Sequence, residues 1–203
     1  MAVITISRQF GAGGRTLGNM VAQKIGYRFL DDQIIQEIAE HAKVTRDTVI
    51  SMEKDAGGAI SRMISSLLSR DYMDRLTGEG KGYLDEEVYV QALYEVMAKL
   101  ASEGDVVLIG RGGQYILDKF EGAFHVLLVA NFEDRVTFMQ KHYKLAESKA
   151  EATVASAEKR RINLYRKFGK EDYNDPIHYH LVLNMSRVSL EKGVDLVCSL
   201  VGN

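Results

Sequence analysis

A strand that runs into a glycine-rich turn and then into a helix is the feature of this sequence that most constrains its fold. Residues 2–7 form an apolar strand pattern, three glycines follow within four positions, and helical spacing of apolar residues begins near residue 15. Glycine permits positive φ and lets the backbone approach an anion closely. The free N–H groups and dipole of a helix start attract phosphate. The sequence therefore predicts a phosphate-binding loop made of Gly11, Ala12, Gly13, Gly14, Arg15 and Thr16.

This loop departs at two positions from the nucleotide-binding pattern G-x-x-x-x-G-K-[ST]. Gly14, Arg15 and Thr16 stand at G-K-[ST], whereas Gln9 stands at the first glycine. Arginine keeps the positive charge of lysine but presents a planar fork instead of a compact ammonium. In this alignment Arg15 reaches along the phosphates, and the Thr16 hydroxyl is a ligand of Mg²⁺. The alternative is a glycine-rich turn in an α/β protein that binds no nucleotide.

Length and composition limit the classes of protein to which the chain can belong. With 203 residues, of which 46% are hydrophobic, we expect one domain over residues 1–203 with a small insert. A net charge of −2 offers no basic field for nucleic acid. The lone Cys198 cannot form an internal disulfide, so we expect a cytoplasmic protein. No apolar stretch approaches the ~20 residues that span a bilayer, and no signal peptide is expected at the amino terminus.

Apolar strands alternate with helices along the chain, which predicts a five-stranded parallel sheet between two helical layers. The expected strands are 2–7, 27–30, 106–109, 124–129 and 181–183. The expected helices are 15–25, one beginning at Asp31 or Asp32, 85–102, one after Asn131, one from a capping box at Ser148 and Glu151 to about 168, and 190–201. Ligands gather at the carboxyl ends of such strands. We therefore expect Arg8, the glycine loop, Asp31, Arg111 and the segment after Ala130 to meet there.

The segment 44–84 differs from the rest, because it contains two helical stretches and ends in a glycine-rich loop. Apolar residues between 60 and 68 repeat at helical spacing. They are expected to pack in the core, and a contact between two copies of the chain, a homodimer, is the alternative.

Five motifs occur in the order found in the cytidylate kinase-like proteins, which are similar to the nucleoside monophosphate kinases. They are S-R-Q-F-G-A-G-G-R-T at 7–16, F-L-D-D at 29–32, I-G-R-G-G at 109–113, E-K-R-R-x-x-x-Y at 158–165 and Y-H-L-V-L-N at 179–184. The resemblance covers nearly the whole chain and is weakest over 44–84. It implies a three-layer P-loop NTPase sandwich, with 44–84 as a helical insert on the acceptor side and about 146–176 as a helical lid.

The resemblance also implies an activity, the transfer of the γ-phosphoryl group of ATP, with Mg²⁺, to a nucleoside monophosphate or related acceptor. Gly11–Thr16 resemble the donor-phosphate loop. Asp31 and Arg111 resemble residues that bind the acceptor. Arg160 and Arg161 resemble lid arginines that, together with Arg15, act on the transferring group.

Two departures from the family pattern fall on the acceptor side. Glu37 stands where an arginine is typical, and Gly112 stands where an aspartate is typical. Two alternatives to a nucleotide kinase therefore stay open. One is a P-loop binding module or sensor without phosphotransfer, and the other is a kinase of a small metabolite that is not a nucleotide.

Each candidate residue also has a structural interpretation. Asp31 can be only the N-cap of a helix, Arg111 can pair with Asp31 or Asp32, and Arg160 and Arg161 can belong to a solvated helix face. We expect a structural role for Arg8. Packing or solvation is likewise expected for the remaining candidates, which are His178, Tyr179, His180 and Cys198.

Overall fold

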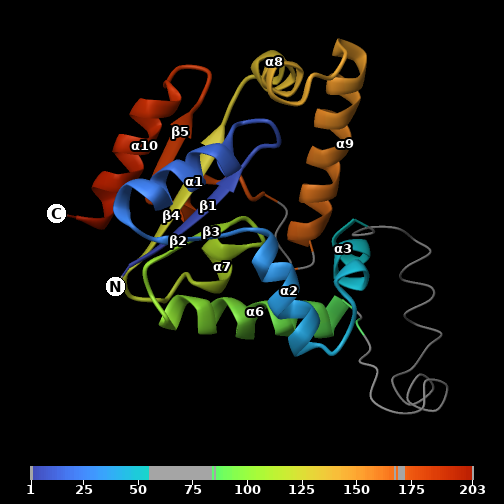
Figure 1. Cartoon of the computed structure of the whole chain (residues 1–203), viewed down its shortest axis with the longest axis vertical. Helices are drawn as coiled ribbons and strands as arrows, with labels where there is room; N and C mark the ends of the chain where they lie inside the picture. The colour runs from blue at the N-terminus through green and yellow to red at the C-terminus, as the bar shows by residue number, and fades with distance from the viewer. Residues whose placement is uncertain (1, 55–83, 85, 167, 169–171, 203) are drawn as a thin grey trace.

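The computed structural model describes residues 2–54, 84, 86–166, 168 and 172–202. Within these residues, five strands form one parallel sheet in the order β2-β3-β1-β4-β5 (Figure 1). The strands are β1 (Val3–Arg8), β2 (Arg28–Leu30), β3 (Val106–Ile109), β4 (Ala123–Val129) and β5 (Leu181–Asn184). β1 lies at the centre of the sheet, so the loop that follows it opens at the middle of the carboxyl edge.

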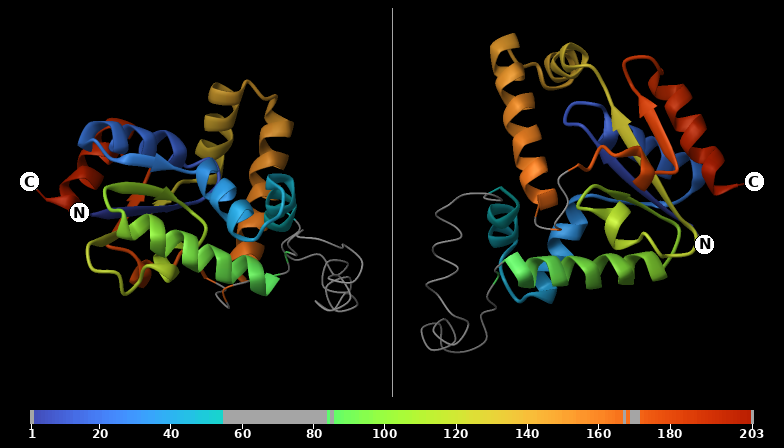
Figure 2. Two further views of the ribbon diagram at one scale, coloured as in Figure 1. Left: turned by 60° about the horizontal axis from the view of Figure 1, so that its bottom comes forward. Right: turned by 180° about the vertical axis from the view of Figure 1, so that it is seen from behind.

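Helices cover both faces of this sheet (Figures 1 and 2). They are α1 (Gly14–Ile25), α2 (Asp32–His41), α3 (Arg46–Lys54), α6 (Glu86–Ser102), α7 (Gly113–Ile116), α8 (Phe132–Tyr143), α9 (Glu147–Arg166) and α10 (Leu190–Cys198), with 3-10 turns η1 (Pro176–His178) and η2 (Ser199–Val201). α1 and α10 pack together on one face, and α2, α6 and α7 lie on the other. The three-layer α/β sandwich predicted from the sequence is confirmed.

The strands are mostly apolar because their side chains point alternately into two cores. Ile4 and Ile6 pack with α1 and α10, whereas Val3 packs with α2 and α6. Val107 packs in the same core as Ile4 and Ile6, and Val106 packs in the same core as Val3. Burial on both faces fixes the strand register, since a slip of one residue would exchange the cores.

The structure corrects three local predictions. α9 begins at Glu147, so Ser148 and Glu151 lie inside the helix and form no capping box. The last helix ends at Cys198 and continues only as the turn η2. The sequence also did not predict α7, which is a single turn of four residues, too short to show a periodic pattern.

The predicted insert is described in part. Its first helical stretch is α3, whose Val49 is buried in the core shared with α2 and α6. The predicted apolar stripe at 60–68 lies outside the described residues. The alternative of a homodimer contact through this stripe therefore stays a prediction.

α8 and α9 form a helical pair beside the sheet, and α9 also contacts α3 (Figure 2). Glu158 of α9 holds this pair against the loop after β1. Its carboxylate accepts a hydrogen bond from the backbone N–H of Phe10 at 2.8 Å, pairs with Arg135 at 3.3 Å and accepts a hydrogen bond from the Tyr173 hydroxyl. α9 is thereby positioned over the carboxyl edge of the sheet.

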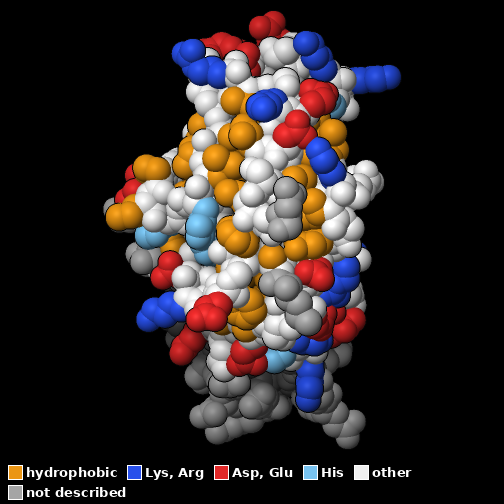
Figure 3. All heavy atoms as spheres, turned by 90° about the vertical axis from the view of Figure 1, so that its left-hand side faces the viewer, with side chains coloured by type: hydrophobic (Ala, Val, Ile, Leu, Met, Phe, Trp, Pro, Cys, Tyr) orange, Lys and Arg blue, Asp and Glu red, His pale blue; other side chains and the backbone are white. Residues whose placement is uncertain are grey.

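β5 forms one edge of the sheet, and its Val182 is 39% exposed. The face on which β5 and α10 lie carries hydrophobic side chains along its middle and charged side chains mainly toward both ends (Figure 3).

None of the helices in the described ranges has the length and apolar character required to cross a bilayer.

His125 lies in the middle of the sheet on β4, and only 3% of its surface is exposed. Its Nδ1 lies 2.7 Å from the Thr5 hydroxyl, and its backbone N–H donates to Nδ1 of His180 at 3.0 Å. Burial, together with the nearby His180, lowers the pKa of His125 to about 4. His180, itself exposed, thus contacts the backbone and the ring of His125.

We expect stability to rise with pH between about 4 and 6.5 because of His125. Its pKa is lower in the folded than in the unfolded chain, so the unfolded chain binds more protons in this range, and the stabilisation is complete only above pH 6.5. From pH 7 to pH 5 the free energy of unfolding should fall by about 2 kcal/mol through this group. Urea unfolding of the wild type and of His125→Gln measures the difference, with exposed His41→Gln as control. Equal pH slopes for wild type and His125→Gln would contradict the prediction.

Candidate functional site

Two adjoining cavities open at the carboxyl edge of the sheet. The larger one, of about 390 Å³, lies between the ends of β1, β2 and β3 and the helices α3 and α9. The smaller one, of about 170 Å³, lies between the glycine loop and α8, and we call it the glycine-loop cavity. Among the residues that line them, Arg8, Phe10, Asp31 and Arg161 line both. The predicted convergence of Arg8, the loop, Asp31 and Arg111 is therefore present.

The glycine loop has the backbone geometry that the sequence predicts for an anion site. Gly11 and Gly13 have φ of 87° and 81°, and α1 begins at Gly14. A Cβ at Gly11 would lie 2.9 Å from Cβ and 3.0 Å from the carbonyl oxygen of Arg135, so the loop passes α8 at a distance that only glycine allows. The first N–H groups of α1 have no partner within the helix. They are the donors that a phosphate chain would use.

Five of the six predicted loop residues line the glycine-loop cavity, namely Gly11, Gly13, Gly14, Arg15 and Thr16. Ala12 instead packs into the core beside α1. Thr16 lies in the first turn of α1. In the described part of the chain, no group of three or more His, Cys, Asp or Glu side chains could hold a metal ion.

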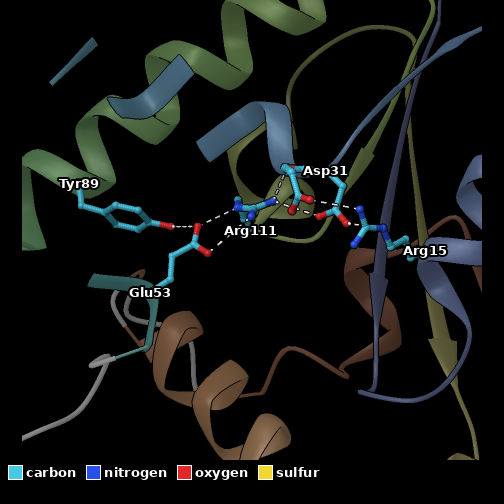
Figure 4. A network of polar contacts seen from close by, with 6 residues as sticks. Arg15, Asp31, Glu53, Tyr89 and Arg111 are labelled. Carbon is cyan, nitrogen blue, oxygen red and sulfur yellow. Dashed lines mark hydrogen bonds and ion pairs between the residues drawn. The ribbon is translucent and has the colours of Figure 1, made fainter. Parts of the chain in front are cut away.

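Arg15 lies at the rim of the glycine-loop cavity, and its side chain is 60% exposed. Its Nε lies 3.4 Å from Asp31, and its Nη2 lies 3.2 Å from Asp32 (Figure 4). The guanidinium is thus directed toward the end of β2 instead of along the loop. Its predicted part in phosphate binding stays a prediction.

Arg111 is the centre of a buried ion network at the end of β3 (Figure 4). Its Nε donates to Glu53 at 2.7 Å, and its Nη1 donates to the backbone carbonyl of Asp31 at 2.8 Å and lies 3.4 Å from the Asp31 carboxylate. The Tyr89 hydroxyl donates to Glu53 at 3.1 Å. Arg111 and Asp31 are each only 10% exposed, so the charges of α3, β2 and β3 meet on the wall of the larger cavity, where little of their surface is in contact with solvent.

The electrostatics of this network follow from burial and from its carboxylates. Burial acts to lower the pKa of Arg111, but Glu53 above all, with Asp31, raises it above the ordinary value. Burial, reinforced by Glu53, raises the pKa of Tyr89 well above its usual range. Both groups therefore stay protonated, and Arg111 stays a cation that a ligand anion could share with Glu53.

The network bears on two structural interpretations that the sequence left open, while the ligand roles of Asp31 and Arg111 stay predictions. Asp31 stands at the N-cap of α2 but accepts no capping hydrogen bond, because its carboxylate faces Arg15 and Arg111. Arg111 does pair with Asp31, and its main partner is Glu53 from the insert. The sequence offered no signal for Glu53, since the pairing depends on how α3 packs.

The two residues that depart from the family pattern, Glu37 and Gly112, do not line the larger cavity. Glu37 faces α6, where it pairs with Lys99 at 3.2 Å. Gly112 has φ of 76° and lies under the Phe168 ring, which a Cβ would approach to 3.0 Å.

Arg160 and Arg161 are neighbours on α9 but differ in environment. Arg160 is exposed and lines the larger cavity but not the glycine-loop cavity. Arg161 donates to the backbone carbonyl of Arg8, lies 5.9 Å above the Phe10 ring and lines both cavities. Burial lowers the pKa of Arg161. Arg161 thus occupies the junction between the cavities.

Arg8 lies at the carboxyl edge of the sheet, as expected, and the structural role predicted for it stays a prediction. It ends β1 and lines both cavities beside Arg161. Burial, with the proximity of Arg161, lowers its pKa to about 9. Among the residues that the structure describes, no carboxylate forms an ion pair with Arg8 or Arg161. Two adjacent cations that form no ion pair offer a place for an anion, although Asp31 lies near both and Glu158 lies near Arg161.

The sequence model of the cytidylate kinase-like family matches residues 3–187, a range that contains the glycine loop, Asp31, Arg111 and Arg161. The chain belongs to the cytidylate kinase-like family. No curated protein sequence matches the chain.

Solved structures show the fold that this family member shares with other proteins. An uncharacterized protein from Eubacterium ventriosum aligns with a TM-score of 0.67 and 15% identity over 99% of this chain and 98% of that chain. Shikimate kinase from Bacteroides thetaiotaomicron gives 0.51 and 14% over 100% and 99%. Shikimate kinase from Acinetobacter baumannii, in complex with shikimate, gives 0.50 and 16% over 99% and 93%. At these identities the likeness is one of fold alone.

Proposed function

We propose that this protein transfers the γ-phosphoryl group of ATP to a nucleoside monophosphate or a related small acceptor. The observation that carries the proposal is the junction of the two cavities at Arg8 and Arg161. ATP would bind with its phosphates in the glycine-loop cavity, and the acceptor would occupy the larger cavity. The transferring group would then pass between the two arginines.

The residues fit the demands of phosphoryl transfer, which depends on positioning and on neutralising charge. The loop glycines and the start of α1 supply N–H donors to the phosphates. The Thr16 hydroxyl would be a ligand of Mg²⁺ carried by ATP, an ion that neutralises phosphate charge when bound. Arg161, with Arg160 at the edge of the larger cavity, would stabilise the transferring group. The helix α9 carries both arginines, and Glu158 holds it on the loop after β1. This helix would act as the lid over the site.

Arg111 would bind the anionic group of the acceptor. Its guanidinium already has Glu53 and Asp31 as partners, so an acceptor phosphate must share it with Glu53 or displace that carboxylate. Asp31 would accept a hydrogen bond from a hydroxyl or amino group of the acceptor.

The lining of the larger cavity favours a second candidate acceptor, a hydroxylated metabolite that is not a nucleotide. Asp31, Asp32 and Glu53 place three carboxylates on this lining, beside Arg111. Carboxylates bind hydroxyl groups through two acceptor oxygens. An acceptor with several hydroxyls and one anionic group would match both kinds of side chain.

Incubation with ATP, Mg²⁺ and separate panels of nucleoside monophosphates and anionic polyols tests both candidates. We expect ADP formation that depends on the acceptor and reaches rates typical of kinases, about 1–100 s⁻¹. Turnover with polyols alone would select the second candidate.

Stabilisation by ATP without turnover in either panel would contradict the proposed transfer and indicate a nucleotide-binding module. Such binding is measurable on its own, because a ligand at about 100 times its Kd raises the free energy of unfolding by about 2.7 kcal/mol.

A further inference from the structure

The side chain of Arg8 crosses the start of α1 and reaches the end of β3. A Cβ placed on Gly14 would lie 2.8 Å from Cγ and 3.0 Å from Cδ of Arg8. A Cβ placed on Gly110 would lie 2.2 Å from Nη1 of Arg8. The Arg8 chain therefore fills the space above the first residue of α1, and its guanidinium lies at the junction of the two cavities.

This geometry changes how the loop aligns with G-x-x-x-x-G-K-[ST]. The left-handed glycine immediately before α1 is Gly13, whereas Gly14 is already helical. If Gly13 is the last glycine of the pattern, Gly14 stands at the lysine, Arg15 at the Ser/Thr and Arg8 at the first glycine, so that Thr16 follows the pattern by one residue. A cationic side chain is then missing from position 14 and present at position 8, and the Arg8 chain lies where a side chain of residue 14 would begin.

The two arginines near the loop differ in availability for a phosphate. Arg15 is directed at Asp31 and Asp32. Arg8 has no ion-pair partner within the described ranges, and its neighbour Arg161 is a second cation. Asp31 lies near both arginines without forming an ion pair with either. Two like charges held together in this way are stabilised further when an anion binds between them.

We propose that Arg8 serves as the phosphate-binding cation of the loop in place of the lysine, contacting the β- and γ-phosphates of ATP from the end of β1. The inference rests on the proposed function, since it names the residue that holds the donor. The planar guanidinium can donate to two phosphate oxygens at once, as an ammonium cannot. Arg15 accordingly serves to hold Asp31 and Asp32 at the edge of the larger cavity.

Binding of ATP with Mg²⁺, measured by calorimetry and by the shift in melting temperature, tests the assignment. Arg8→Met should raise the Kd at least about tenfold, because it removes charge-assisted hydrogen bonds. Arg15→Met should raise it less than Arg8→Met does. Lys24→Met, at the far end of α1 and paired with Asp195 on the surface, is the matched control and should leave the Kd unchanged.

A transplant of the charge gives a second, more specific test. Gly14→Lys alone should weaken ATP binding, because its Cβ would meet the Arg8 chain at 2.8 Å. Arg8→Gly should weaken it through loss of the cation. The double variant Arg8→Gly/Gly14→Lys should recover at least about tenfold in Kd over Arg8→Gly, since the cation then returns to the helix start.

The outcomes separate this inference from the proposed function. A wild-type protein that does not bind ATP would overturn both. ATP binding by the wild type with an equal Kd for Arg8→Met, or with the larger loss in Arg15→Met, would overturn the inference alone. So would a fall in the melting temperature of ligand-free Arg8→Met that accounts for the lost binding, because it would make Arg8 structural.

Discussion

Replacing Arg161 by methionine is expected to lower kcat about 10³-fold while the protein stays folded. Arginines that stabilise the transferring phosphoryl group contribute factors of about 10³ to 10⁵ in related reactions. Arg161 lies where the two cavities meet, and its guanidinium is fixed by the Arg8 carbonyl and the Phe10 ring. It therefore needs no reorganisation to face the reacting group. The measurement is steady-state turnover of ATP with the acceptor that the panels identify.

Lys159→Met is the matched control for Arg161→Met, since Lys159 is exposed on the same helix and lines the groove between α8 and α9 instead. It should leave kcat within about twofold, as surface substitutions do. Arg160→Met should lower kcat less than Arg161→Met does, because Arg160 is exposed and lines only the larger cavity. If Arg161→Met raised KM with kcat unchanged, the residue would bind ground state and transition state equally and the assignment would be wrong.

Replacing Arg111 by methionine is expected to lower the free energy of unfolding by about 3–5 kcal/mol. The substitution leaves the carboxylates of Asp31 and Glu53 without their shared cation in a region where they are 10% and 19% exposed. An unpaired buried charge costs more than the pair contributes. Urea or thermal unfolding without ligand measures the loss.

Arg28→Met controls for the loss of an arginine from an ion pair. Arg28 pairs with Glu103 at 2.8 Å, but the two side chains are 51% and 40% exposed. Such surface pairs contribute about 0–1 kcal/mol. A loss below about 1 kcal/mol for Arg111→Met would show that water reaches the network. Arg111→Met combined with Glu53→Gln should recover part of the loss, because it removes one of the stranded charges.

Much of the architecture could be predicted because it depends on local patterns. Largely apolar runs predicted β1, β3 and β4, since strands buried on both faces carry few polar residues, here Thr5, Ser7 and His125. Helical spacing predicted α1 and α6 to within one residue at each end. The capping box at Ser148 was wrong, because a cap pattern does not exclude one more helical residue before it.

The candidate site was predicted less completely, because its contacts join residues far apart in the chain. The parallel sheet brings Asp31 and Arg111 to one edge, and that part was foreseen from the ends of their strands. Glu53 comes from the insert, 58 residues from Arg111. Its pairing with Arg111 could not be inferred from the sequence, because it depends on how α3 packs.

The sequence by itself determined that glycines at 11 and 13 lead from a buried strand into a helix, and hence that a glycine-rich loop lies at the carboxyl edge of a parallel sheet, where we propose that phosphate binds. Backbone conformation of this kind is set by local residue types. Only the tertiary structure decided where the charges of the nearby arginines lie, and the proposed role of Arg8 rests on that placement. An arginine side chain is long and flexible, so its neighbours determine where its charge lies: Asp31 and Asp32 hold Arg15 aside, whereas Gly14 and Gly110 leave room for Arg8.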